Sequence, residues 1–174
     1  MSTNPVSEPP SHEIIIVRTP EERQQCYDVR IEVFHHEQKF PLETEIDDME
    51  DNATHFLLRL TPSLTPIGTI RAFKVPGKEY YKLTRLAVLK DYRQYRFGRA
   101  LVERLHDWVN EDALRNNGAN TTGALVEIVS HSQIPVKGFY AKFGYEPQGP
   151  EFDEDGDPHQ KMVFRMPLRP SPAA

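Results

Sequence analysis

One segment of the chain, residues 81 to 116, constrains the fold more than any other. Tyr81 to Leu89 is a strand-like run, and the residues from Gly98 to about Asn116 place apolar side chains at helical spacing. A basic turn joins them. A strand that delivers such a turn to the start of a helix presents unpaired backbone N–H groups and the positive end of the helix dipole, which together favour an anion such as phosphate.

The charge of this segment is opposite to that of the whole chain. Residues 82 to 104 hold seven basic and two acidic side chains, whereas the full chain has a formal net charge of -5. A basic run alone is more often a solvated helix face, but the strand, turn and helix context favours an anion site here. The overall negative charge argues against nucleic acid and anionic membranes as partners.

Length and composition fit one globular domain, because 38% of the 174 residues are hydrophobic and 27% are charged. The proline-rich ends, residues 1–12 and 167–174, are expected to be disordered tails around a single domain at 13–166. No membrane-length apolar run or signal peptide is found, so we expect a cytoplasmic protein. The single cysteine, Cys26, excludes an internal disulfide framework and lies in an apolar helical stripe.

The remaining patterns predict a mixed sheet with helices on its faces, of the α/β (α+β) class. Thr19 to Glu22 has the pattern of a capping box and begins a helix, and Asn117-Gly118 ends the long one. The expected order is β-α-β-β-β-α-β-α-β-β. Strands are expected at 13–18, 55–60, 68–74, 81–89, 124–129, 145–152 and 161–166, and a short helix at 135–143.

The basic turn and its surroundings resemble the GNAT superfamily of acetyl-CoA-dependent N-acetyltransferases. The pyrophosphate loop of that family reads Q/R-x-x-G-x-G/A, and residues 93–98 match it at Arg93 and Gly98, with Arg96 at the first glycine position. Further motifs of the family recur in order between residues 13 and 166. They are Val29-Arg30-x-x-Val33-Phe34-x-x-Glu37-Gln38, Gly68-Thr69-Ile70-Arg71, Leu83-Thr84-Arg85-Leu86-Ala87-Val88, His131-Ser132-Gln133, Phe139-Tyr140-x-x-Phe143-Gly144-Tyr145 and Gly149-x-x-Phe152-x-Glu154-x-Gly156-x-Pro158-His159-x-x-Met162.

The resemblance implies a GNAT fold, whose mixed, mostly antiparallel sheet is splayed between the strand before and the strand after the pyrophosphate-loop helix, with helices on both faces. It also implies acetyl-CoA as the cosubstrate. The acidic run at 153–157 lacks the ligand spacing of an EF-hand, so no metal is expected. By resemblance, the residues that bind acetyl-CoA are Leu86, Ala87, Val88, Arg93, Gln94, Tyr95, Arg96, Phe97, Gly98, Arg99, Ala100, Gln133 and Tyr140.

Acetyl transfer to an amine needs a neutral amine, a polarised thioester carbonyl and a proton for the departing thiolate. The resemblance assigns the thiolate's proton to Tyr140 and the polarising N–H to Val88. Two histidines, His131 and His159, are base candidates, and we favour His159 because its acidic segment flanks the substrate pocket in the family. Glu127, Glu154 and Asp155 are the alternatives.

The loop at residues 43–51 contains six acidic side chains and no basic one. One interpretation is a solvated loop. The other follows from the family, in which this part of the fold borders the acceptor site: Glu45, Asp47 and Asp48 would attract a protonated amine. The one basic pair that suits a sugar phosphate is Arg30 with Arg71. The candidate substrate-binding residues are therefore Arg30, Glu45, Asp47, Arg71, Glu127, Glu154 and Asp155.

We expect an enzyme that transfers the acetyl group of acetyl-CoA directly to a primary amine of a small molecule, such as an amino sugar or a polyamine. The alternatives are a glucosamine-phosphate N-acetyltransferase and a protein or peptide N-acetyltransferase. A non-catalytic acetyl-CoA-binding regulatory module is the alternative of another class. Tyr140, the expected proton donor, favours the enzyme, whereas Arg96, at a glycine position of the motif, favours the module. The oligomeric state is open, with a homodimer as one alternative.

Overall fold

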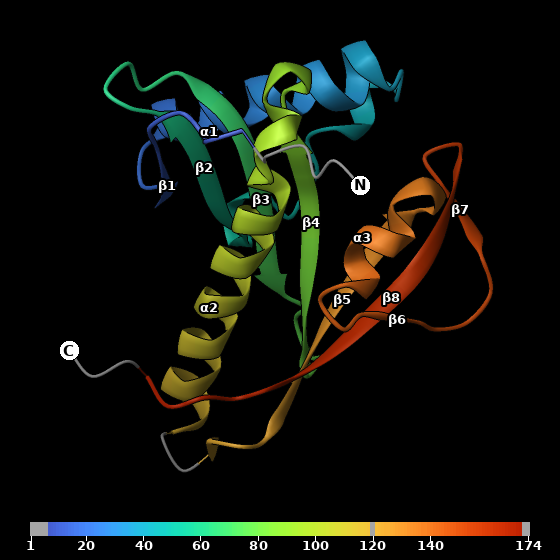
Figure 1. The fold of residues 1–174 in the computed structure, drawn as a ribbon. Coiled ribbons are helices and arrows are strands. Elements are labelled where there is room, and N and C mark those ends of the chain that lie inside the picture. Colours follow the sequence, from blue (N-terminus) through green and yellow to red (C-terminus); the bar gives the residue numbers. More distant parts are fainter. Residues whose placement is uncertain (1–6, 119–120, 172–174) are drawn as a thin grey trace, which may run out of the picture. The chain divides into compact units, whose positions relative to one another are not determined.

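The computed structural model describes residues 7–118 and 121–171 (Figure 1). The chain divides into two compact units, residues 1–71 with 85–104 and residues 72–84 with 105–174. Three elements contribute a part to each unit: β3 (Pro66–Lys74), β4 (Tyr80–Val88) and α2 (Phe97–Asn117). The expected tails lie partly outside the described residues.

The first unit contains the sheet order β1-β2-β3-β4. Strand β1 (His12–Ile16) pairs antiparallel with β2 (Thr54–Leu60), with His12 opposite Leu60. Helix α1 (Pro20–Arg30) packs on β2, and a π-helical stretch at Ile31–Glu37 continues it. Short 3-10 turns at Leu42–Thr44, Glu50–Asn52 and Lys90–Tyr95 complete the helical segments of this unit.

Helix α1 starts where the capping box predicts. The Thr19 hydroxyl accepts a hydrogen bond from the Glu22 N–H at 3.1 Å, and the Glu22 carboxylate accepts one from the Thr19 N–H at 3.2 Å. The helix buries Cys26 and Val29 fully or nearly so. The prediction of this helix start is therefore confirmed.

A glycine on β3 sets how closely α2 can approach the sheet of the first unit. A Cβ at Gly68 would lie 2.9 Å from Cδ2 of Leu58 and 3.3 Å from Cδ1 of Leu101. Both leucines are fully buried, so neither has room to move aside. Gly68 therefore allows the first turns of α2 to pack tightly over β2 and β3, which fixes the position of the loop before α2.

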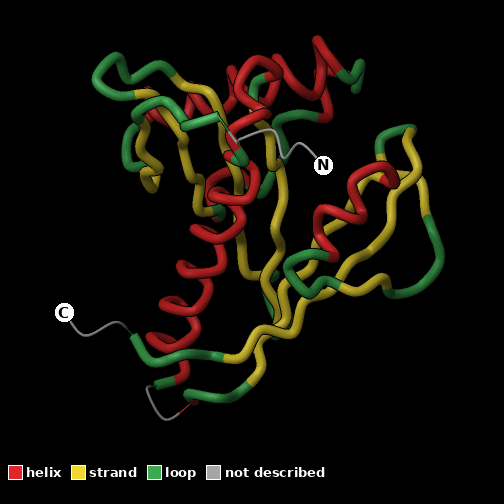
Figure 2. The backbone as a smooth tube through the Cα atoms, in the orientation of Figure 1, coloured by secondary structure: helices red, strands yellow, loops and turns green. Residues whose placement is uncertain are grey.

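The second unit has the sheet order β4-β5-β8-β6. Strand β5 (Leu125–Gln133) runs parallel to the first part of β4, from Tyr80 opposite Glu127 to Leu83 opposite Ser130. It pairs antiparallel with β8 (Asp157–Pro167) over its whole length. Strands β6 (Glu146–Pro147) and β7 (Phe152–Glu154) also pair antiparallel with β8. A 3-10 turn at Ile134–Val136 leads into α3 (Lys137–Ala141), which packs on β5 and β8 (Figure 2).

The fold class is as expected, because the sheet is mixed: β4 runs parallel to β5, whereas β1–β2, β5–β8, β6–β8 and β7–β8 pair antiparallel. The expected strands at 145–152 and 161–166 were wrong in detail. The structure has three strands here, and β7 and β8 form a hairpin around Asp155 and Gly156, whose φ angles are 55° and 85°. Asp-Gly suits such a two-residue turn because both residues tolerate positive φ. None of the helices in the described ranges has the length and apolar composition to cross a membrane.

Candidate active site

The predicted pyrophosphate loop belongs to the first unit. At the first glycine position of the motif its backbone has a conformation that glycine favours, although the residue there is Arg96. The 3-10 turn at Lys90–Tyr95 ends at Arg96, whose φ of 60° and ψ of 31° are left-handed. An arginine in this conformation costs about 1–2 kcal/mol relative to a right-handed residue. Helix α2 follows at once, and its first N–H groups lack helical acceptors. The N–H of Ala100, however, donates to the Arg96 carbonyl at 3.2 Å.

The side chains of this loop differ in what they offer a ligand. Phe97 is 2% exposed and stacks edge-on against His12, which leaves only its main chain accessible. Arg99 pairs with Glu103 at 2.8 Å. Arg96 is exposed, and no carboxylate in the described ranges pairs with it. Gln94 is exposed, Tyr95, Leu86, Gly98 and Ala100 are half-buried, and Ala87 and Val88 are buried.

Arg93 ties two segments of the first unit together. Its Nε donates to the Val88 carbonyl at 2.9 Å, and its terminal nitrogens each lie 2.6 Å from a carboxylate oxygen of Glu37. The hydrogen bond from Arg93 holds the pKa of Glu37 below its usual range. The family resemblance implied a phosphate role for Arg93 and no role for Glu37, although Glu37 belongs to the family motif of the first helix.

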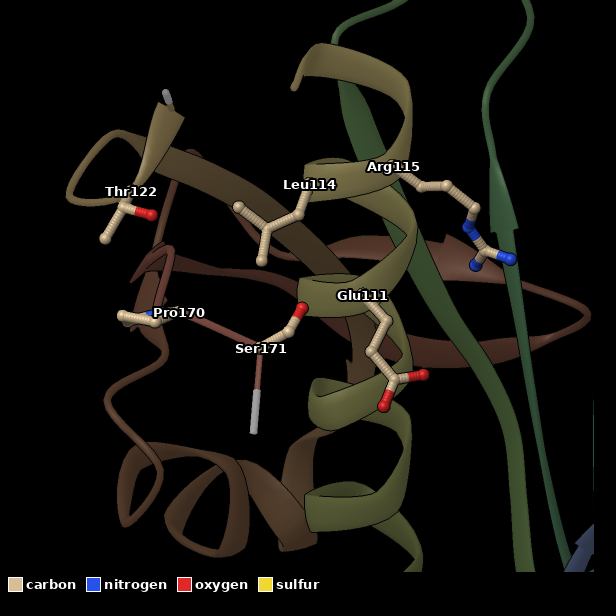
Figure 3. Close-up of a pocket in the computed structure, with 6 residues that line it drawn as sticks. All are labelled: Glu111, Leu114, Arg115, Thr122, Pro170 and Ser171. Carbon is tan, nitrogen blue, oxygen red and sulfur yellow. The ribbon is translucent and has the colours of Figure 1, made fainter. Parts of the chain in front are cut away.

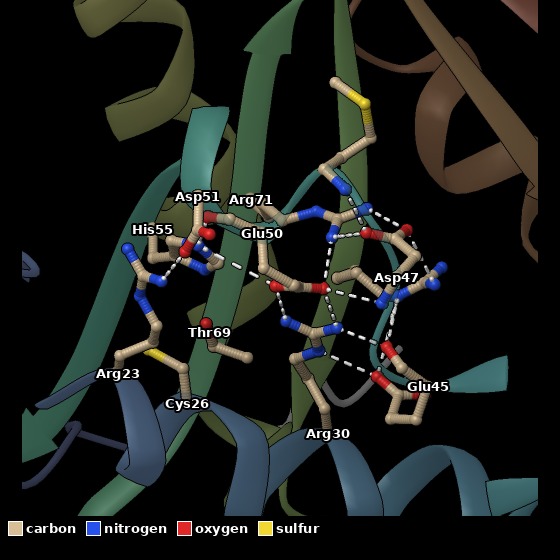
Figure 4. A network of polar contacts seen from close by, with 12 residues as sticks. Arg23, Cys26, Arg30, Glu45, Asp47, Glu50, Asp51, His55, Thr69 and Arg71 are labelled. Atoms are coloured by element: carbon tan, nitrogen blue, oxygen red, sulfur yellow. Dashed lines mark hydrogen bonds and ion pairs between the residues drawn. The ribbon is translucent and has the colours of Figure 1, made fainter. Parts of the chain in front are cut away.

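Four of the residues predicted to bind substrate, Arg30, Glu45, Asp47 and Arg71, form an internal network with Glu50 in the first unit (Figure 4). Arg30 donates from Nε to Glu45 at 2.7 Å and binds both oxygens of Glu50 at 2.8 and 2.9 Å. Arg71 contacts Glu50 as well and pairs with Asp47 at 2.8 and 2.9 Å. Arg30, Glu45, Glu50 and Arg71 are all at most 5% exposed.

A third arginine joins the network from a distorted position in β4. Arg85 has a φ of 55°, and its Nη2 donates to the Thr44 carbonyl at 3.1 Å and to Asp47 at 3.3 Å. Three arginines thus balance three carboxylates. Burial opposes ionisation of Asp47 and Glu50, but the guanidinium groups outweigh it, so the pKa of each carboxyl lies below its usual range.

The acidic loop has an internal and an exposed part. Glu45, Asp47 and Glu50 face arginines of their own unit, whereas Glu43, Asp48 and Asp51 are exposed. The attraction of an amine by Glu45, Asp47 and Asp48 stays a prediction, although the first two already pair with arginines. Sequence spacing could not have shown this pairing, because the arginine partners come from α1, β3 and β4.

Tyr140 belongs to the second unit. It is 7% exposed on α3, and its phenol hydrogen-bonds the side chain of Ser130 on β5. Burial raises the pKa of this phenol, although the bond to Ser130 opposes the shift. The hydroxyl therefore holds its proton at neutral pH, as a proton donor must.

The second unit also gathers most of the base candidates. Nδ1 of His131 lies 2.9 Å from one carboxylate oxygen of Glu154, and Nε2 of His159 lies 3.8 Å from the other. Gln133 is opposite His159 in the β5–β8 register. Glu127 lies further back on β5, opposite Arg165, and Asp155 is exposed in the hairpin turn. The structure thus groups His131, Glu154 and His159 and leaves Glu127 and Asp155 apart.

A cavity of about 600 Å³ lies at the end of α2 in the second unit (Figure 3). Leu114 is turned toward the segments that carry Thr122 and Pro170, whereas the Arg115 side chain extends the other way. Glu111 and Ser171 complete the lining. No residue predicted to bind acetyl-CoA or the acceptor lines this cavity.

Comparison with known proteins decides the family. The model of the acetyltransferase (GNAT) domain family matches residues 19–166. The chain belongs to the GNAT superfamily. Two Bacillus subtilis relatives support this assignment: the uncharacterized N-acetyltransferase YjcF is 31% identical over 86% of this chain and 96% of its own length, and the uncharacterized protein YyaT is 34% identical over 68% and 70%.

Solved structures agree with this GNAT assignment. A candidate N-acetyltransferase from Lactobacillus plantarum superimposes with a TM-score of 0.71 at 26% identity, over 89% of this chain and 98% of its own. Escherichia coli YhbS, solved in complex with CoA, shares the fold with a TM-score of 0.60 at 18% identity, over 89% and 81%. This GNAT protein is therefore an acyltransferase, an acetyl-CoA-dependent N-acetyltransferase, as the resemblance implied.

Proposed function

We propose that this enzyme acetylates an unphosphorylated primary amine of a small molecule, such as an amino sugar or a polyamine. The observation that carries the proposal is the burial and ion pairing of Arg30 and Arg71, the two arginines that would suit a sugar phosphate. Both are at most 2% exposed, and carboxylates of residues 43–51 neutralise them. A phosphate group would have to displace these carboxylates from a buried network, which is costly.

For the donor, we propose that acetyl-CoA lies along β4 and the start of α2. The main chain of residues 86–88 would bond the pantetheine arm, with the Val88 N–H directed at the acetyl carbonyl oxygen. The first-turn amides of α2 and the guanidinium of Arg96, which no carboxylate of residues 7–118 and 121–171 pairs with, would hold the pyrophosphate. Residues 93–95 and Ala100 would shape the same loop.

Three groups of the chain would then carry the chemistry. Bound acetyl-CoA supplies an activated acetyl group as a thioester. The Val88 N–H stabilises the negative charge that develops on the carbonyl oxygen. Tyr140 gives its proton to the departing thiolate, and its raised pKa supports this role because the phenol is protonated at neutral pH. A base on the second unit accepts the proton of the amine.

The experiment is a thiol-release assay with acetyl-CoA and a panel of amines. The panel contains an amino sugar, the same sugar with a phosphate, a polyamine, and peptides with a free N-terminus or a lysine. We expect the highest kcat/KM with an unphosphorylated small amine. A preference for the phosphorylated sugar or for a peptide would contradict the proposal, as would acetyl-CoA binding without turnover of any amine.

A further inference from the structure

A carboxylate and an imidazole meet at one end of the second unit. Glu154 on β7 accepts a hydrogen bond at 2.9 Å from His131 on β5. An ionised carboxylate can only accept hydrogen bonds, so the proton of this bond is on Nδ1 of His131. In the neutral ring the lone pair is then on Nε2. Glu154 thus fixes the tautomer of His131, as second-sphere carboxylates do for reactive histidines in other enzymes.

The two histidines beside Glu154 differ in accessibility. The side chain of His131 is 26% exposed and that of Glu154 39%, whereas that of His159 is 7% exposed. Nδ1 of His159 donates to the Asp157 carbonyl at 2.8 Å, and its Nε2 faces Glu154 at 3.8 Å. The ring of Phe152 stands edge-on to His131, with centroids 5.0 Å apart. Of the two, His131 is the one that an amine can reach.

His131 also lies on the opposite face of β5 from the proposed proton donor. Tyr140 bonds Ser130, and the next residue along a strand points to the other face. The pairing of β5 with β4 ends at Ser130, so His131 begins the part of β5 that β4 no longer covers. A reacting group at this uncovered edge would have a proton donor on one face and a proton acceptor on the other. This arrangement would let one group accept the proton of the amine while another protonates the departing thiolate.

We propose that His131, positioned by Glu154, is the base that accepts the proton of the acceptor amine. This inference rests on the proposed function and names the chemistry of its acceptor site. A carboxylate beside an aromatic ring suits an ammonium group on an apolar or hydroxylated carbon frame. The charged groups on this face include Lys161, opposite His131 on β8, His159 on the same strand, Lys82 on β4, which interacts electrostatically with Glu154, and, further back, Glu127 opposite Arg165.

The protons balance in the following way. One proton of the ammonium group passes to Nε2 of His131 and then to water, and this is the one proton that the overall reaction releases. The neutral nitrogen bonds the acetyl carbon as the carbon–sulfur bond breaks. The thiolate takes the phenolic proton of Tyr140, and the second surplus proton of the nitrogen restores the phenol through water. The products are the amide and the free thiol of CoA.

The test compares His131→Ala with the wild-type enzyme at pH 7 and pH 9. At pH 7 we expect kcat/KM for the amine to fall about 100-fold, which is the lower end of the rate loss expected when a general base is removed. The KM for acetyl-CoA should be unchanged. At pH 9 the loss should shrink to less than about 10-fold, because a larger share of the amine is then neutral in solution. Added imidazole should restore part of the rate at pH 7, which a purely structural histidine would not allow. The control is His36→Ala, since His36 is exposed in the first unit.

Glu154→Gln separates positioning from catalysis. An amide oxygen can still accept the bond from Nδ1 but carries no charge, so we expect a loss of about 10-fold at pH 7. The acidic limb of its pH–rate profile should move to lower pH, because a carboxylate favours a protonated neighbour. Glu151→Gln, at an exposed position before β7, is the matched control.

The outcomes distinguish the two proposals. If the wild-type enzyme acetylates no amine of the panel, the proposed function fails and this inference with it. If the wild-type enzyme is active and His131→Ala keeps its rate at pH 7, this inference alone is overturned. A loss of kcat/KM in His131→Ala that does not depend on pH and is not rescued by imidazole overturns it too. The same holds if the pH-dependent loss that imidazole rescues occurs in His159→Gln and not in His131→Ala. His131→Gln, which keeps much of the side-chain volume, replaces His131→Ala if the alanine variant does not fold.

Discussion

Glu50 in the first unit and Glu154 in the second each contact basic side chains, and the pKa of both is lowered. Their surroundings differ. The side chain of Glu50 is 7% exposed and faces two guanidinium groups, which stay charged at every relevant pH, and the buried His55 at 3.8 Å, whose pKa is lowered by burial. The side chain of Glu154 is 39% exposed and faces two imidazoles, the side chain that most often acts as an acid or base in enzymes. The buried ion pairs of Glu50 suit a structural role, whereas the contact of Glu154 with histidines suits proton transfer.

The largest expected effect tests the structural side of this comparison. Arg30→Met leaves Glu45 and Glu50 without their main partner in the interior, so we expect the free energy of unfolding to fall by about 3–5 kcal/mol. Urea unfolding measures it. Arg99→Met is the control, because its ion pair with Glu103 is more than half exposed and should contribute under about 0.5 kcal/mol. A loss below about 1 kcal/mol for Arg30→Met would show that the network does not hold residues 43–51 in place.

The next effect tests the chemical side. Tyr140→Phe should lower kcat about 100-fold, the effect of removing a general acid, and cost about 1 kcal/mol of stability for the lost bond to Ser130. Steady-state kinetics and urea unfolding measure the two quantities. Tyr145→Phe is the matched control, since Tyr145 is 2% exposed and its hydroxyl bonds His106 at 2.8 Å. Equal kcat values for the two variants would remove Tyr140 from the mechanism.

A third prediction compares the two carboxylates by acid unfolding. A carboxyl whose pKa is lowered in the folded state adds stability above its unfolded pKa, and this stability is lost as the pH falls through the folded value. The wild-type protein should therefore lose stability as the pH drops below about 4. Glu50→Gln should flatten this dependence more than Glu154→Gln, because Glu50 is the more buried. Urea unfolding at several pH values between 3 and 7 checks the order, and identical slopes in both variants would contradict it.

The smallest effect concerns Arg96, which pairs with no carboxylate in the part of the chain that the structure describes. Arg96→Gly relieves the left-handed backbone by about 1–2 kcal/mol but loses about 0.5–1 kcal/mol through the freedom of glycine in the unfolded chain. We therefore expect a net stability change of about 1 kcal/mol or less, in contrast to Arg30→Met. If the guanidinium binds pyrophosphate, the KM for acetyl-CoA should rise several-fold. An unchanged KM would assign the phosphate to the helix amides alone.

The fold could be predicted from the sequence because its signals are local. The capping box at Thr19, the glycine after α2 and the apolar spacing of both long helices act through neighbours in the chain. The β7–β8 hairpin was not predicted although its Asp-Gly turn is also a local signal, because two of the three residues of β7 are acidic and acidic side chains are uncommon in strands.

The arrangement of the candidate site could be predicted only in part, for a physical reason. Motif spacing brought Tyr140, His131 and Glu154 into consideration, but it could not show which side chains meet. Glu50 was one of six similar acids, and its partners Arg30 and Arg71 lie 20 and 21 residues away. Long-range pairing of this kind depends on the tertiary fold. Arg96 is the opposite case: the residue departs from the motif, yet the backbone keeps the conformation that glycine favours.

The lone cysteine has a practical consequence for these experiments. Cys26 lies on the buried face of α1 and is completely buried, and burial raises the pKa of its thiol to about 11. A thiol reagent in the assay will therefore detect released CoA against almost no signal from the folded enzyme. When a variant unfolds, its own sulfhydryl becomes reactive in a one-to-one ratio with the protein. The same reagent thus reports both turnover and loss of the native state.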